Sequence, residues 1–219
     1  MSILEVSHRS SVFEEILGRV EANIRELARV PANYHVFFLQ GGASQQFSMV
    51  PMNLLHNQSG PAQYVLTGTW GTKACEQARR EGPVEVVWDG AETDYDRLPN
   101  ASRWNSSKNA AYRHITTNET IQGVQFPHEP QTGDVPLACD ASSDFLCRPL
   151  DMPRYGLLYA CAQKNAGPAG VTIVILRDDA HVGQAQKGEN QSRGCCRGGG
   201  PPVVPSWPKR GSRPAEAVM

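Results

Sequence analysis

The sequence has little net charge, no long apolar run and no signal-like start. Its 219 residues carry 21 basic and 22 acidic side chains, so the formal net charge is −1. A nearly neutral chain has no general electrostatic reason to bind nucleic acid or an anionic membrane. The longest apolar runs, such as 171–176, are too short to span a bilayer. An acid, Glu5, stands where a signal peptide would have basic residues. We therefore expect a cytoplasmic protein without nucleic-acid or membrane partners.

The pattern of cysteine and histidine lacks the spacings of common metal sites. None of the six cysteines forms a C-x-x-C pair, and the six histidines include no H-x-x-x-H. We therefore expect no metal. The cysteines before residue 180 lie in apolar stretches, which is typical of reduced, buried thiols in a cytosolic protein.

Composition divides the chain near residue 180. Residues 181–219 contain seven glycines and five prolines but no Ile, Leu, Phe or Tyr, and their net charge is +4, against −5 for residues 1–180. A segment with so few large apolar groups cannot offset the entropy lost on ordering it. We expect one domain over 1–180 and a disordered tail over 181–219. The tail is either a natural extension or a stretch from a wrong reading frame or retained intron, and its foreign composition favours the second interpretation.

Apolar periodicity predicts helices alternating with strands. Helices are expected at 10–29, 43–55 and 70–80. Strands are expected at 63–67, 84–88, 112–116, 137–140, 156–161 and 171–176, besides an early one at 34–39. Ser10 or Ser11 can cap the first helix, and Pro31 should end it. This order of elements favours an α/β domain with a largely parallel sheet.

Four short segments follow predicted strands directly, and in a parallel sheet ligands bind beyond the carboxyl ends of the strands. The small residues of Gly41–Ser44 precede a helix and suit a phosphate group, although an ordinary turn has the same composition. Gly68–Trp70 follows the next strand. Asp140 is either a cap for the next segment or a partner for a cationic ligand. Gln163–Lys164 ends in a lysine that is either solvated or a Schiff-base nucleophile. A phosphate cradle, a buried acid and such a lysine are the groups that a pyridoxal-phosphate site requires.

A family resemblance rests on six segments, which occur in the same order as in that family. They are Phe38–Phe47, Pro51–Leu54, Thr67–Trp70, Thr117–Gly123, Asp140–Asp144 and Ala162–Gly170. The stretch Glu5–Arg9 matches the family segment that precedes them. These segments resemble the phosphoserine aminotransferases, a fold-type-I family within the class V aminotransferases.

The resemblance implies a large domain that binds pyridoxal 5′-phosphate, with one role for each matching residue. Lys164 would form the Schiff base with the cofactor and then carry the proton between Cα and the C4′ carbon. Asp140 would bond to the pyridinium nitrogen, and Trp70 would stack on the ring. The other implied contacts are Ala43, Ser44 and Gln163 with the phosphate, Thr120 with the phenolic oxygen side, and Arg9 with a substrate carboxylate.

The resemblance also implies a reaction and a set of partners. Family members transfer the amino group of L-glutamate to 3-phosphohydroxypyruvate in serine biosynthesis, giving O-phospho-L-serine and 2-oxoglutarate, and they form homodimers. Relatives extend beyond both ends of this chain, into a small C-terminal domain. The parts without a counterpart here include a second substrate-binding arginine and an Asn-Thr pair that reaches the cofactor phosphate of the neighbouring subunit. We expect incomplete substrate clamps, which leaves the activity of this chain by itself open.

Two alternatives remain. The chain could be a non-catalytic truncated isoform or mispredicted product that at most binds pyridoxal phosphate or a full-length subunit. It could also be a class V relative with another substrate, such as a desulfurase, which would need a catalytic cysteine on a mobile loop. The sequence disfavours the desulfurase, because its cysteines are expected in strands or in the tail.

Overall fold

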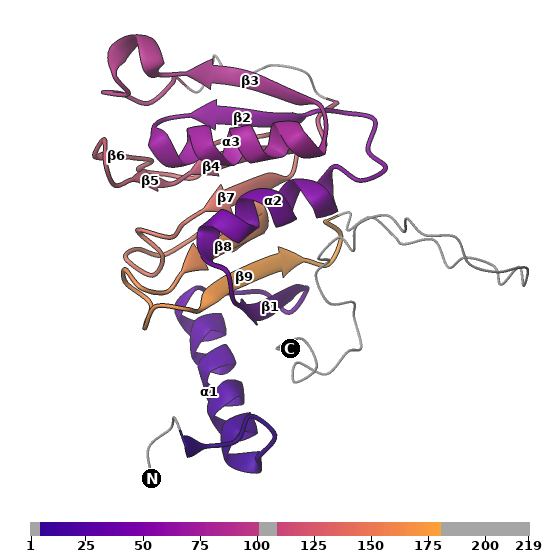
Figure 1. Ribbon diagram of the computed structural model, residues 1–219, viewed down its shortest axis with the longest axis vertical. Helices are drawn as coiled ribbons and strands as arrows, with labels where there is room; N and C mark the ends of the chain where they lie inside the picture. The colour runs from indigo at the N-terminus through magenta and orange to yellow at the C-terminus, as the bar shows by residue number, and fades with distance from the viewer. Residues whose placement is uncertain (1–4, 101–108, 181–219) are drawn as a thin grey trace, which may run out of the picture.

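The protein is described here by a computed structural model that covers residues 5–100 and 109–180, so the predicted disordered tail lies outside the described residues. Seven strands form one sheet in the order β1-β9-β8-β7-β4-β2-β3 (Figure 1). Their bounds are Tyr34–Leu39 (β1), Ala62–Leu66 (β2), Val84–Asp89 (β3), Tyr112–Thr116 (β4), Leu137–Asp140 (β7), Tyr155–Cys161 (β8) and Thr172–Arg177 (β9). The strands β8, β7, β4, β2 and β3 run parallel, and only β9 pairs antiparallel, with β1 and β8. The predicted α/β class with a largely parallel sheet is confirmed.

Two helices cover one face of this sheet. The helices α2 (Gly42–Leu54) and α3 (Thr69–Glu81) lie side by side in front of the strands (Figure 1). Phe47 and Val50 of α2 pack with Tyr64 of β2 and Tyr159 of β8 in one apolar cluster. Short 3-10 turns at Ala91–Thr93 and Met152–Arg154 connect other elements. The packing of α2 and α3 brings both helix N-termini to the carboxyl ends of the strands.

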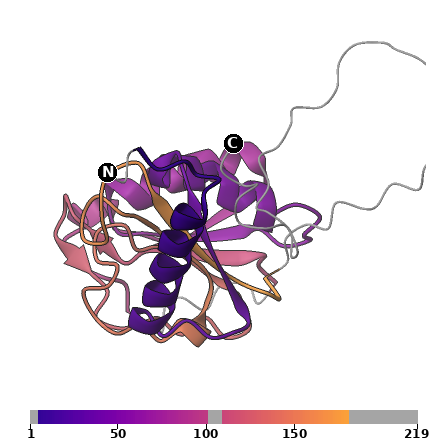
Figure 2. The ribbon, with the colours of Figure 1, turned by 90° about the horizontal axis from the view of Figure 1, so that it is seen from below.

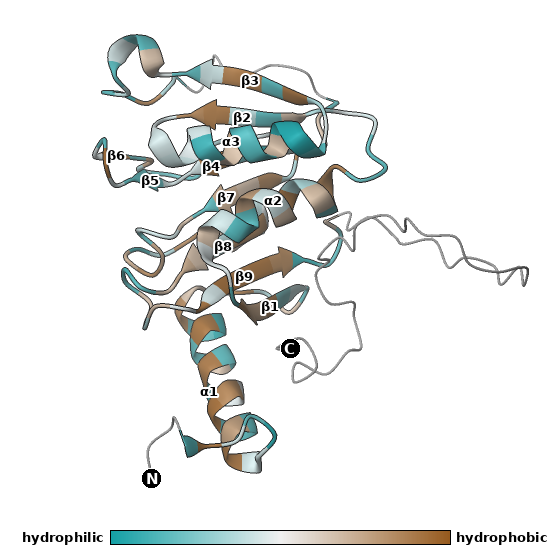
Figure 3. Ribbon diagram, viewed as in Figure 1, coloured by the Kyte–Doolittle hydropathy of each residue, from teal (hydrophilic) through white to brown (hydrophobic). Residues whose placement is uncertain are grey.

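The first helix, α1 (Ser11–Leu27), lies at the β1 edge of the sheet, nearest to the viewer in Figure 2. Only its end joins the core, where Ile24 packs in a second cluster with Ile173 and Ile175 of β9. Apolar residues mark one side of the helix in Figure 3, and Val20 and Leu27 are exposed.

Both ends of α1 can be compared with the sequence prediction. The Ser10 hydroxyl accepts the N–H of Phe13, so the predicted cap is confirmed. The helix does not continue to the residues before Pro31, because Arg29 adopts a left-handed conformation with φ of 52° and the N–H of Val30 turns back to the carbonyl of Arg25. Backbone reversal therefore ends this helix before proline does.

A small hairpin of β5 (Asn118–Glu119) and β6 (Val124–Gln125) follows β4 and was not predicted. Strands of two residues are too short to show an apolar alternation. The turn between them includes Gly123 with φ of +72°, a conformation that glycine adopts without strain. The hairpin stands next to the ends of β4 and β7, so its side chains reach the site described below.

The four cysteines within the described residues are all free thiols. Cys75, Cys139 and Cys161 are free and buried, whereas Cys147 is free and exposed. The prediction that the cysteines lie in strands is wrong for Cys75, which is in α3, and for Cys147, which lies in a loop.

Among residues 5–100 and 109–180, no helix has both the length and the apolar character needed to cross a membrane. The same residues contain no group of three His, Cys, Asp or Glu side chains that could hold a metal ion.

Candidate functional site

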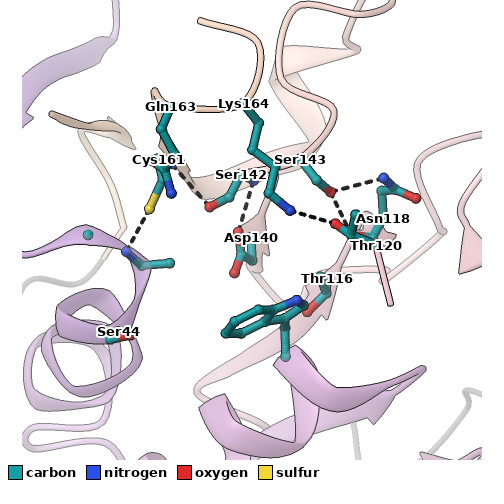
Figure 4. Close-up of a pocket in the computed structure, with 13 residues that line it drawn as sticks. Ser44, Thr116, Asn118, Thr120, Asp140, Ser142, Ser143, Cys161, Gln163 and Lys164 are labelled. Carbon is teal, nitrogen blue, oxygen red and sulfur yellow. Dashed lines mark hydrogen bonds between the residues drawn. The ribbon is translucent and has the colours of Figure 1, made fainter. Parts of the chain in front are cut away.

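A cavity of about 200 Å³ lies at the carboxyl ends of β4, β7 and β8, beside the start of α2 and α3 (Figure 4). The residues that line it include Gly42, Thr116, Asn118, Ser142, Ser143 and Cys161. They also include every residue for which the sequence predicted a cofactor contact, namely Ala43, Ser44, Trp70, Thr120, Asp140, Gln163 and Lys164. The structure therefore brings together predicted contact residues that are far apart in sequence. Ala43 and Lys164 are separated by 121 positions.

Asp140 is the last residue of β7, and its side chain lies at the base of the cavity (Figure 4). It is only 3% exposed, and one oxygen accepts the backbone N–H of Ser142 at 2.9 Å. Burial raises the pKa of this carboxyl to about 6, the contact with Ser142 opposes that rise, and the charges of Glu119 and Asp144 add to it. A buried acid with so few donors is suited to a cationic or N–H group of a ligand.

Lys164 follows β8 and extends toward the hairpin across the mouth of the cavity (Figure 4). Its Nζ atom donates a hydrogen bond to the hydroxyl of Thr120 at 2.8 Å. Both residues are exposed, so the amine is accessible from the cavity and from solvent. This contact holds the only amine among the described lining residues in a defined position.

The start of α2 forms another wall of the cavity. Gly41 precedes the helix with φ of 91°, and no side chain caps the first turn. The N–H of Ala43 donates to the sulfur of Cys161 at 2.7 Å. Sulfur is a weak acceptor, so a phosphate oxygen could take over this N–H together with the hydroxyl of Ser44. Gly41–Ser44 therefore offers donors that suit a phosphate group, and its role as a phosphate cradle stays a prediction.

Trp70 lies in the first turn of α3 and is held at its backbone and near its ring. Its N–H donates to the carboxylate of Glu119 at 3.0 Å. The ammonium group of Lys73 lies 4.8 Å from the centroid of the indole ring, a cation–π distance. The half-buried ring offers a flat apolar surface to the cavity.

The hairpin and the loop after β7 are joined by several hydrogen bonds. The amide of Asn118 donates to the Ser143 hydroxyl at 3.0 Å, and that hydroxyl donates to the Asn118 carbonyl at 2.7 Å (Figure 4). The Thr117 hydroxyl donates to the carboxylate of Asp144, and its backbone N–H donates to the carbonyl of Asp140 at 2.9 Å. These contacts fix the hairpin relative to the end of β7.

The sequence analysis missed some residues that line the cavity, and one residue that it predicted lies outside the cavity. Thr116 and Cys161 each end a strand, so the same rule that singled out Asp140 could have found them. Arg9, predicted to bind a substrate carboxylate, is exposed just before α1 and does not line the cavity. Its assignment remains a prediction.

Comparison with known proteins places these features in a family. A family model for class V aminotransferases matches residues 2–189. A curated phosphoserine aminotransferase of Rhodopirellula baltica is 58% identical over 179 residues, which are 81% of this chain and 48% of that protein.

Solved structures agree with the sequence comparison. The phosphoserine aminotransferase of Bacillus circulans subsp. alkalophilus superposes with a TM-score of 0.79 and 47% identity, covering 82% of this chain and 50% of that one. A phosphoserine aminotransferase of Trichomonas vaginalis, described as bound to PLP, gives a TM-score of 0.75 and 38% identity, covering 83% and 51%. This chain spans about half the length of the relatives it matches. It belongs to the class V aminotransferases.

Proposed function

We propose that this chain binds pyridoxal 5′-phosphate in the cavity and is a phosphoserine aminotransferase. The reaction would move the amino group of L-glutamate to 3-phosphohydroxypyruvate, giving O-phospho-L-serine and 2-oxoglutarate for serine biosynthesis. The named relatives support this reaction. The observation that carries it is that Asp140, Lys164 and the start of α2 face one cavity. From the family we also propose a cytoplasmic homodimer.

The chemistry of the lining residues fits the cofactor. A protonated ring nitrogen beside Asp140 would supply the positive partner that this buried carboxylate lacks, and would return its pKa toward the ordinary range. The N–H of Ala43 and the hydroxyl of Ser44 are donors for phosphate oxygens, with Gln163 at the rim. Lys164 is the amine through which the cofactor would be held.

Each residue then has a physical task. When bound, pyridoxal phosphate supplies a conjugated ring that takes up the electron pair freed at the substrate Cα. Asp140 would keep the ring nitrogen charged, and the indole of Trp70 would shield one face of the ring from water. The Nζ atom of Lys164 would take the proton from the substrate Cα and return it at the C4′ carbon of the cofactor. The Thr120 hydroxyl accepts a hydrogen bond from that amine at 2.8 Å and so fixes its position in the chain without cofactor. Arg9 would pair with a substrate carboxylate.

Reductive labelling tests the proposal. Borohydride added to the chain with pyridoxal phosphate should fix the cofactor on the peptide that contains Lys164. Label on Lys73, which lies near Trp70 but on α3, would overturn the assignment of Lys164. Formation of phosphoserine from glutamate and 3-phosphohydroxypyruvate tests the reaction itself. Labelling of Lys164 without turnover would support the alternative of a chain that only binds the cofactor.

A further inference from the structure

The first turn of α3 is capped by side chains from the hairpin. The two carboxylate oxygens of Glu119 accept the N–H groups of Trp70 at 3.0 Å and Gly71 at 2.7 Å. The amide oxygen of Gln122 accepts the N–H of Thr69 at 3.3 Å, and its nitrogen donates to the Thr69 hydroxyl at 2.8 Å. The residue before the helix, Gly68, has no side chain to offer. All three N–H groups at the start of the helix are therefore satisfied by the hairpin.

Capping alone does not require a buried charge. A Ser or Asn at position 68 could cap the helix with its neutral side chain. Glu119 is instead fully buried, and burial raises its pKa, although the N–H groups of Gly71 and Trp70, the Thr116 hydroxyl and the charge of Lys164 oppose that rise. Burying a carboxylate is costly, so its presence here points to a task that a local cap would not perform.

The helix start leaves room for this carboxylate. A Cβ atom at Gly68 would lie 2.7 Å from Cδ of Glu119 and 2.5 Å from the amide oxygen of Gln122. A Cβ atom at Gly71 would lie 3.3 Å from the nearer carboxylate oxygen. The absence of a side chain at position 68 therefore admits Glu119 to the start of the helix.

The same hairpin contacts both Trp70, which would stack on a cofactor ring, and Lys164, which would bind the cofactor. Glu119 binds the backbone of Trp70, and the next residue, Thr120, binds the amine of Lys164. We propose that Glu119 is a positioning residue that fixes the Trp70 indole relative to Lys164, so that the indole and the Lys164 amine keep one relative position. The proposal rests on the function proposed above. Small misplacements of such groups have large effects on rate.

Two substitutions disturb the contact in different ways. Glu119→Gln keeps the size of the side chain but removes the charge and turns one acceptor into a donor that faces an N–H group. Gly68→Ala keeps the carboxylate but displaces it, because the added methyl group would lie too close to the Glu119 side chain. The matched control is Glu129→Gln, because Glu129 is also largely buried and accepts hydrogen bonds from Arg148 at 2.9 Å and Tyr155 at 3.0 Å, but lines neither the cavity nor α3.

The first measurement uses the cofactor-free protein. Acrylamide quenching of the Trp70 fluorescence is measured as the difference between each protein and the same protein carrying Trp70→Phe. The signal of the other tryptophans cancels in this difference. We expect at least a twofold faster quenching of Trp70 in Glu119→Gln and in Gly68→Ala, and no change in Glu129→Gln. Thermal unfolding of all variants measures the loss of stability, which the control should share. Unchanged quenching in either folded Glu119→Gln or folded Gly68→Ala would overturn the proposal.

The second measurement adds pyridoxal phosphate. Loss of the positioning contact should weaken cofactor binding about tenfold and change the visible circular dichroism of the bound ring, whereas Glu129→Gln should leave both unchanged. An unaltered dichroism spectrum in Glu119→Gln would contradict the proposal even if stability fell. If the wild-type chain binds no cofactor, the proposed function fails, while the quenching experiment still decides whether Glu119 positions Trp70. Should Glu119→Gln not fold, the folded Gly68→Ala variant, in which the added methyl group displaces the carboxylate, decides the question by the same two measurements.

Discussion

Replacing Asp140 by asparagine should stabilise the cofactor-free chain at neutral pH while it weakens cofactor binding. The folded protein holds this carboxyl at a pKa of about 6 because it is buried, against an ordinary value of 3.8. The folded state therefore binds this proton more tightly than the unfolded state. The resulting stability is fully present below about pH 4 and is lost as the pH rises through about 6. Asparagine is uncharged at every pH, so the variant keeps that stability.

The size of the effect follows from the pKa difference. A rise of about two pKa units corresponds to about 3 kcal/mol, so Asp140→Asn should unfold with about 3 kcal/mol more free energy than wild type at pH 8. Near pH 4 the difference should shrink to about 0.5 kcal/mol. The hydrogen bond from the N–H of Ser142 survives the substitution, since the amide oxygen can accept it.

Urea denaturation of both proteins at pH 4 and pH 8 measures this difference. Asp151→Asn is the control, because Asp151 is an exposed carboxylate paired with Arg154 and should change stability by less than about 1 kcal/mol. Adding pyridoxal phosphate at about a hundred times its dissociation constant should stabilise wild type by about 2.7 kcal/mol, with much less gain in Asp140→Asn. Equal stability of wild type and variant at pH 8 without cofactor would refute the reasoning.

Three further predictions concern other residues. Thr120→Val removes the acceptor for Lys164 and should lower turnover about tenfold, while stability stays within about 0.5 kcal/mol because Thr120 is exposed; a steady-state assay and urea denaturation check this. Arg9→Ala should raise KM for glutamate and leave affinity for pyridoxal phosphate unchanged, and a weaker cofactor affinity would contradict it. Tyr34→Phe should cost about 1 to 2 kcal/mol in thermal or urea unfolding, because the buried hydroxyl lies 2.9 and 2.7 Å from the carbonyls of Met152 and Tyr155; an unchanged midpoint would show that these contacts contribute nothing.

The sequence predicted the sheet and the part of the site that is attached to strand ends. Asp140 and Lys164 each follow an apolar run of the length expected of a strand, and parallel strands place such residues on one edge. The ends of β4 and β7 were predicted without error. These features depend on local pattern, so they can be read from a single chain.

The contacts of the hairpin could not be predicted in this way. Glu119 caps a helix that begins 50 residues earlier, and nothing near Thr69 indicates where the acceptor comes from. The neighbouring strands β5 and β6 have two residues each and show no period. The family resemblance singled out Thr117–Gly123 as a motif, but it assigned a role only to Thr120. The contacts of Glu119 with Trp70 and Gly71 join residues 49 and 48 positions apart, so they depend on the folded chain and not on a local pattern.

Two helix N-termini face the same cavity, and their first N–H groups have different acceptors. A helix N-terminus attracts anions through its unpaired N–H groups and its dipole. At α3 the carboxylate of Glu119 already takes the N–H groups of Trp70 and Gly71, so that end repels a second anion. At α2 the N–H of Ala43 meets only the sulfur of Cys161, a far weaker acceptor. Under the proposed function, a phosphate group that entered the cavity would therefore be directed to α2, and the indole of Trp70 on α3 would be left for the ring.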